Sequence, residues 1–216
     1  MIRIPKEWCR YTPMPDNPLA YTKKMNRMYT RFAKAYERFI VIYKPWKKWL
    51  ETVLPYVHGN RILEVSFGPG YLLTKYPADK KLYGIDYNSL MVHRAKIKIV
   101  KARRKAKLII GNVEKMPYPD NFFDTVINTM AFSGYPDGQK AMSEMLRVIK
   151  PSGRLILLDY DYPMDRNVLG FALVRFIEMC GDIIKDIPKL IKDNHASYDK
   201  IIVGGFGSIQ LFIIKK

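Results

Sequence analysis

The stretch ILEVSFGPGYL, residues 62–72, places an acid at Glu64 and two glycines, Gly68 and Gly70, directly after a short apolar run. Glycine adopts backbone conformations that other residues rarely reach and lets a ligand lie close to the main chain. The pattern therefore predicts a binding loop for a large polar ligand. A dinucleotide fingerprint would require a third glycine where this chain has Leu73, which disfavours a dinucleotide.

Two further polar residues stand at the ends of predicted strands. Asp86 closes KLYGID and Asn112 follows KLIIG. A carboxylate at the first position can accept hydrogen bonds from both hydroxyls of a ribose, and an amide at the second can bond an adenine amino group. Asp86 also has a structural interpretation, as an acid at a helix N-terminus before Ser89, which is a plausible N-cap.

The elements that must position these residues follow from apolar periodicity. Residues 1–20, rich in proline, predict an irregular arm, and residues 21–57 a helical region that Pro45 and Pro55 interrupt. Strands then alternate with helices up to about residue 159, a long helix is expected over 167–193, and residues 198–216 form a β-hairpin around a glycine-rich turn. This order predicts an α/β fold with a mostly parallel sheet, whose ligands bind beyond the carboxyl ends of the strands.

Four segments, ILEVSFGPG, YGIDYN, MPYPDNFFD and MLRVIKPSGRLILLDYDYP, occur in an order and spacing that resembles the class I S-adenosylmethionine-dependent methyltransferases. The likeness is close over residues 61–163. YTRFAKAYE, residues 29–37, further resembles the N-terminal helix of the branch with ubiquinone/menaquinone C-methyltransferases and bacterial phospholipid N-methyltransferases. The resemblance implies a Rossmann-like fold with a seven-stranded, mostly parallel sheet and a C-terminal antiparallel hairpin. It also implies an arm and helical lid over residues 1–60 and one compact cofactor-binding domain over 61–216.

The resemblance implies S-adenosyl-L-methionine as the cofactor and assigns roles to individual residues. Glu64 and the loop would hold its amino-acid end, Asp86 its ribose and Tyr87 its adenine face. The full set of expected cofactor residues is Tyr36, Glu64, Ser66, Gly68, Gly70, Asp86, Tyr87, Asn112, Val113 and Thr129. Ser66 and Asn112 depart from the commonest pattern of the superfamily, which has glycine and aspartate there, but both are small and polar.

Methyl transfer from a sulfonium depends mainly on alignment and exclusion of water, and a base is needed only if the acceptor must lose a proton. The expected catalytic residues are Tyr29 on the lid, Tyr135 after the fourth strand and Asp161 after the fifth. As an alternative, Asp161 and the neighbouring acid after the fifth strand serve only to solvate a loop or to cap a helix. His58, His93 and His195 are expected to be structural, and no metal is expected.

The formal net charge of +17 favours an anionic partner, and residues 92–108 contain eight Lys or Arg and no acid. Trp46 and Trp49 beside lysines suggest a helix that lies in a lipid interface. We therefore expect a cytoplasmic, peripherally membrane-bound enzyme with a lipid-like acceptor, a phospholipid amine or a quinone-type ring. A soluble small-molecule acceptor, RNA, and a silent cofactor-binding partner of another enzyme remain as alternatives. No Asn-Pro-Pro-aromatic signature of base-amine methylation follows the fourth strand, which disfavours nucleic acid as the acceptor. The sequence leaves the oligomeric state open.

Overall fold

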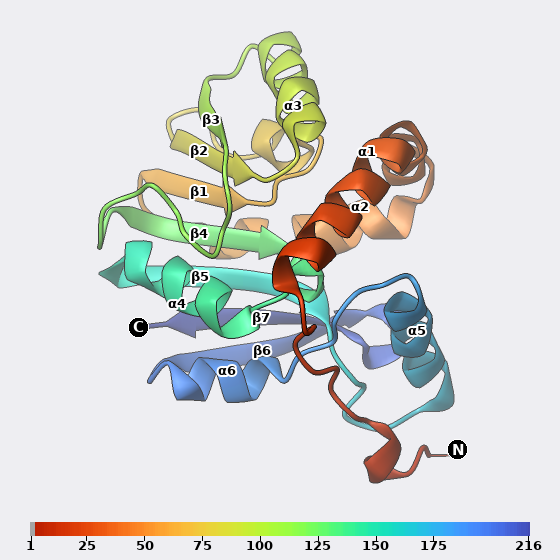
Figure 1. The fold of residues 1–216 in the computed structure, drawn as a ribbon. Coiled ribbons are helices and arrows are strands. Elements are labelled where there is room, and N and C mark those ends of the chain that lie inside the picture. Colours follow the sequence, from red (N-terminus) through yellow and green to blue (C-terminus); the bar gives the residue numbers. More distant parts are fainter. Residues whose placement is uncertain (1–2) are drawn as a thin grey trace.

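The computed structural model describes residues 3–216, although within the first helix the side chains of Tyr36, Phe39, Ile40 and Val41 lie outside the description. The chain forms one seven-stranded sheet in the order β3-β2-β1-β4-β5-β7-β6, with helices on both faces (Figure 1). The strands are β1 (Arg61–Val65), β2 (Lys81–Asp86), β3 (Ala106–Ile110), β4 (Phe123–Thr129), β5 (Ile149–Tyr160), β6 (Ser197–Gly204) and β7 (Ile209–Lys215). The helices are α1 (Pro18–Ile42), α2 (Lys44–Glu51), α3 (Ser89–Lys101), α4 (Gly138–Val148), α5 (Val168–Met179) and α6 (Ile187–Asp193).

The sheet has the predicted topology. Strands β3, β2, β1, β4 and β5 pair in parallel, whereas β7 runs antiparallel between β5 and β6. The turn of the terminal hairpin contains Gly205 and Gly207, both with positive φ. The strand order reverses between β1 and β4, so the carboxyl ends of these two strands mark the place where a doubly wound sheet binds its ligand.

The core consists of two clusters, one on each face of the sheet. Alternate residues of β1 point to opposite faces, so that Ile62 joins a cluster with residues of α2, α3 and α5. Leu63 joins a second cluster with residues of α4 and α6. Within residues 3–216 no helix is long and apolar enough to cross a membrane.

Several predicted boundaries are wrong, for local reasons. The arm contains a short 3-10 helix (Lys6–Trp8), and α1 begins at Pro18, where the side chain of Asn17 accepts a hydrogen bond from the Ala20 amide at 2.9 Å. The predicted interruption at Pro45 is confirmed, since the helical region breaks at Tyr43. A proline lacks the amide hydrogen that would donate to the carbonyl four residues earlier, and Pro45 lies in the first turn of α2. The N-cap of α3 is Asn88, whose oxygen accepts from the Met91 amide, and the predicted cap Ser89 is the first helical residue.

The single long helix expected over residues 167–193 is two helices. Helix α5 ends at Met179, Gly181 adopts a φ of 106° in the connection, and α6 begins after the N-cap Asp186 with Pro188 in its first turn. Continuous apolar content predicted a helix here, but a positive φ and a proline each interrupt the helical hydrogen bonds.

The two tryptophans expected at a lipid interface pack inside the protein. Trp46 is buried in the cluster with Leu50 and Val53, and the half-buried Trp49 packs edge-on against Trp46 with ring centroids 6.3 Å apart. Trp49 also lies so close to Gly204 that a Cβ there would collide with the indole. Helix α2 is therefore part of the core, and we propose that the lid is α1 alone and not the whole of residues 1–60.

Candidate active site

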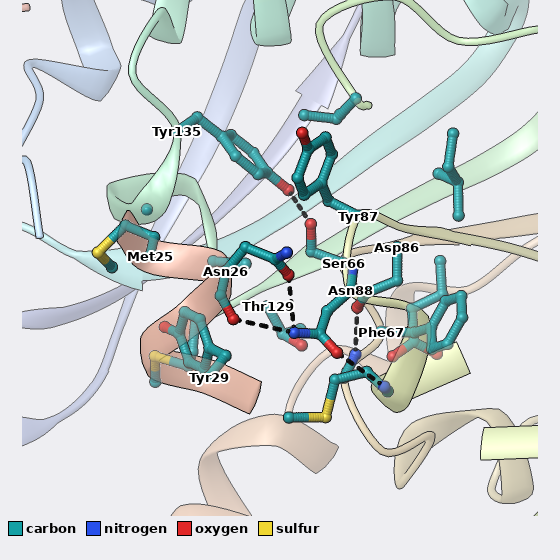
Figure 2. Close-up of a pocket in the computed structure, with 18 of the residues that line it drawn as sticks. Met25, Asn26, Tyr29, Ser66, Phe67, Asp86, Tyr87, Asn88, Thr129 and Tyr135 are labelled. Carbon is teal, nitrogen blue, oxygen red and sulfur yellow. Dashed lines mark hydrogen bonds between the residues drawn. The ribbon is translucent and has the colours of Figure 1, made fainter. Parts of the chain in front are cut away.

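A pocket lies where the parallel strands end, and residues of α1 line one side of it (Figure 2). It encloses about 1140 Å³ of empty space, including the open solvent at its entrance. Of the residues expected from the sequence, those that line it are Tyr29, Glu64, Ser66, Gly68, Asp86, Tyr87, Asn112, Val113, Thr129 and Tyr135. One pocket thus joins residues from β1, β2, β4 and α1 that are distant in the chain.

The glycine loop after β1 turns sharply beneath this pocket. Ser66, Gly68 and Gly70 all have positive φ, of 50°, 54° and 77°. A Cβ on Gly70 would lie 2.8 Å from the Cβ of Ala95, so glycine is required for α3 to pack against the loop. The Gly68 amide donates to the Asp86 carboxylate at 2.8 Å.

Asp86, at the end of β2, lines the pocket and accepts hydrogen bonds from the glycine loop and from the residue before α3. One carboxylate oxygen accepts the Gly68 amide, and the other accepts the Asn88 amide at 2.8 Å. Burial raises the pKa of Asp86 to about 6, against the opposing effect of these two amide donors. Each carboxylate oxygen has a second lone-pair direction, which suits the two hydroxyls of a ribose.

Glu64 is the most strongly perturbed acid that lines the pocket. Its side chain is 2% exposed, and burial raises the pKa of Glu64 to about 8, with the Tyr76 hydroxyl opposing and the Asp86 charge adding to the rise. A cationic group beside Glu64 would restore its ionised form. The ammonium of an amino-acid ligand has the required charge.

Three polar side chains form a chain of hydrogen bonds along one wall. The amide of Asn128 donates to the Tyr135 hydroxyl at 2.7 Å, and this hydroxyl lies 2.7 Å from the Ser66 hydroxyl (Figure 2). Burial raises the pKa of Tyr135 far above its ordinary value. Tyr135 is therefore protonated near neutral pH, and it can position or donate but not act as a base.

Asn88 connects α1 to the cofactor loop and is a residue that the sequence interpretation missed. Its oxygen caps α3, while its amide donates to the Asn26 side-chain oxygen at 2.8 Å (Figure 2). The same amide also donates to the Thr30 hydroxyl at 2.8 Å. Arg94 and Glu37 add an ion pair between the same two helices. Through these contacts Met25 and Tyr29 face the pocket.

The remaining predicted residues are placed as follows. The Asn112 oxygen accepts from the Glu114 amide at 2.9 Å, which commits one of its lone pairs to the turn. Val113 is buried and Tyr87 is exposed at the rim. Gly70 is not among the pocket-lining residues and packs against Ala95 of α3. The side chain of Tyr36 lies outside the described residues.

The structure does not bring Asp161 to the pocket. Its carboxylate is buried, accepting the Tyr11 hydroxyl at 3.1 Å and the Tyr162 amide at 2.7 Å, and it thereby anchors the N-terminal arm. Burial raises the pKa of Asp161 to about 6. The sequence could not show that the arm returns to cover the end of β5.

Comparison with known proteins agrees with this geometry. A model of a family described as methyltransferase domain matches residues 63–157. The ubiquinone/menaquinone biosynthesis C-methyltransferase UbiE of Rickettsia typhi is 28% identical over 213 residues, which are 91% of this chain and 82% of the relative. The enzyme of the same name from Stutzerimonas stutzeri is 30% identical over 131 residues. These residues are 58% of this chain and 51% of that relative, so the chain spans about half the length of the relative.

Residues 63–157 are thus a methyltransferase domain, and the chain resembles the class I S-adenosylmethionine-dependent methyltransferases. A solved structure of a SAM-dependent methyltransferase from Thermotoga maritima, described as a possible histamine N-methyltransferase, superposes with a TM-score of 0.71 at 18% identity, covering 89% of this chain and 99% of that one. This likeness concerns the fold. The donor set of this chain fits S-adenosylmethionine, because it has two buried carboxylates, Glu64 and Asp86, and a loop that needs glycine at position 70 to pack against α3.

Proposed function

We propose that this methyltransferase acts on a lipid-like acceptor with a quinone-type ring and methylates a ring carbon. The observation that carries the proposal is the contrast between the two sides of the pocket. Glu64 and Asp86 lie on the sheet side, whereas α1 contributes the apolar Met25 and the aromatic Tyr29 opposite them. The UbiE relatives, named for ubiquinone/menaquinone biosynthesis, support a ring of this kind.

The proposed roles of the residues follow from their positions. S-adenosylmethionine supplies an electrophilic methyl group. Glu64 would bind its ammonium, Asp86 its ribose hydroxyls, and Ser66 and Thr129 polar atoms of the amino-acid part. Tyr29 and Tyr135 would orient the acceptor ring from opposite sides, and α1 would exclude water from the reacting atoms.

We further propose that α1 is a lid that opens for exchange of ligands. Asn88 supports this, because its side chain caps the first turn of α3 and also donates to the middle of α1, while its backbone amide donates to Asp86 at the end of β2. An acceptor dissolved in a bilayer would be met at the membrane surface, so peripheral membrane association is part of the proposal.

The experiment is a methyl-transfer assay with labelled cofactor and separate acceptors: a short-chain quinol lacking one ring methyl, phosphatidylethanolamine, and total RNA. Label on a ring carbon of the quinol, located by mass spectrometry, is the expected result. Label only on the phospholipid amine or on RNA would overturn the quinone assignment. Tyr29→Phe should raise KM for the quinol and leave the cofactor Kd unchanged, with Tyr43→Phe outside the pocket as the matched control.

A further inference from the structure

The outer side of α5 and the neighbouring hairpin carry a group of large apolar side chains that face solvent. Each is between 49% and 83% exposed. We call this group the α5 face; it consists of Met164, Leu169, Phe176, Met179, Ile202 and Phe206. Large exposed apolar patches on soluble domains mark interaction sites.

The α5 face is continuous. Met164, Leu169, Ile202 and Phe206 line one shallow groove, and the Asn167 amide holds the hairpin turn against α5 by donating to the Phe206 carbonyl at 2.7 Å. Phe176 and Met179 follow Leu169 by about two and three helical turns, on the same side of α5. At its edge, Trp8 is also exposed and packs against Phe171 with ring centroids 6.5 Å apart.

Positive charge lies on α1, whose first turn contacts the segment just after α5. Helix α5 has one cation and one acid, Arg175 and Glu178, which pair with each other at 2.6 Å. Helix α1 has six cations, all of them exposed, and a single acid, which pairs with Arg94. The cations are Lys23, Lys24, Arg27, Arg31, Lys34 and Arg38. Both helices lie at the carboxyl end of the sheet (Figure 1).

The two helices also meet beside the active site. The Tyr21 hydroxyl on α1 donates to the Gly181 carbonyl just after α5 at 2.8 Å. Met25, which lines the pocket, lies against Gly181. The α5 face therefore ends next to the lid side of the pocket.

We propose that the α5 face docks into an anionic lipid surface while the cations of α1 contact the head groups, which brings the pocket to the source of its acceptor. An apolar face beside a cationic one is the pattern that binds such a surface. A second copy of this chain is disfavoured as the occupant, because it would bring the like-charged α1 helices toward one another. The inference rests on the proposed lipid-like acceptor.

The test is flotation of the full chain with vesicles of phosphatidylcholine alone or with equal parts of phosphatidylglycerol. Binding should require phosphatidylglycerol and weaken as salt is raised, because exposed charges are screened over about 10 Å at 0.1 M salt. Leu169→Glu and Phe176→Glu should each reduce binding by about tenfold or more, since each removes an inserted apolar group and adds repulsion. Val100→Glu, at an equally exposed apolar site on α3, is the charge-matched control and should change binding by less than about twofold.

Failure of the wild-type chain to float, or an equal loss in Val100→Glu, would overturn the docking surface. Dimers in sedimentation velocity that Leu169→Glu converts to monomers would instead assign the face to a second copy. Methylation of the soluble short-chain quinol separates this proposal from the enzymatic one. Transfer without vesicle binding refutes only the docking surface, and specific vesicle binding without transfer refutes only the quinone acceptor.

Discussion

Replacement of Glu64 by glutamine should make the protein more stable near neutral pH. Burial raises the pKa of Glu64 from 4.5 to about 8 in the folded protein. Because the folded state favours the protonated acid, Glu64 lowers the free energy of unfolding progressively as pH rises from 4.5 to 8, and has no such effect below 4.5. One unit between the two pKa values corresponds to about 1.4 kcal/mol, so retaining this acid at pH 7 costs about 3 kcal/mol.

Glu64→Gln removes this cost but leaves a buried amide that must find partners, such as the Tyr76 hydroxyl. We therefore expect a gain of about 1–3 kcal/mol at pH 7 that shrinks toward zero at pH 4.5. Urea unfolding at a series of pH values from 4.5 to 8 measures it. Glu144→Gln is the control of opposite sign, because its hydrogen bonds with Arg147 lower the pKa of Glu144 and removal of that charge should reduce stability above pH 4.5.

The stabilisation should be accompanied by weaker cofactor binding. If Glu64 binds the cofactor ammonium, it must release its proton on binding at pH 7, and calorimetry in buffers of different ionisation enthalpy should detect this release in the wild type only. A variant that is less stable at pH 7, or a stability difference that is constant with pH, would refute the reasoning about burial. Unchanged cofactor affinity would refute only the ammonium assignment.

Three further predictions concern the loop, the lid and the core. Asp86→Ala should raise the cofactor Kd by several-fold to a hundredfold, about 1–3 kcal/mol for charge-assisted hydrogen bonds, and a folded variant with wild-type affinity in calorimetry would exclude Asp86 from the site. Asn88→Ala removes the contacts to Asn26 and Thr30 as well as one helix cap. It should therefore speed proteolytic cleavage within α1 while the thermal midpoint changes by only a few degrees. Equal cleavage rates in the variant and the wild type would argue against the lid. Gly204→Ala should destabilise the protein by about 1–3 kcal/mol in urea unfolding, because its methyl group would overlap Trp49, and a neutral effect would show that this contact relaxes.

The order of strands and helices was predictable from the sequence because apolar periodicity is a local property that burial imposes on each element. The glycine loop and Asp86 were identifiable for a related reason. A tight turn after a strand requires particular residue types within a few positions, and parallel strands bring their carboxyl ends to one edge. The helix ends were less predictable, as Asn88 and the break at Gly181 show, because neighbouring residues compete for the same cap or turn.

Only the tertiary structure decided which side chains meet across long sequence separations. Trp46 and Asp161 had residue types suited to a membrane interface and to catalysis. Trp46 is buried by the assembled core cluster and Asp161 is covered by the N-terminal arm, and no local pattern encodes either contact. The same holds for the α5 face. Its apolar residues predicted a helix but not which of its sides is buried. The side of α5 with Gly170 and Val174 packs inward, which leaves a second apolar side exposed in residues 3–216.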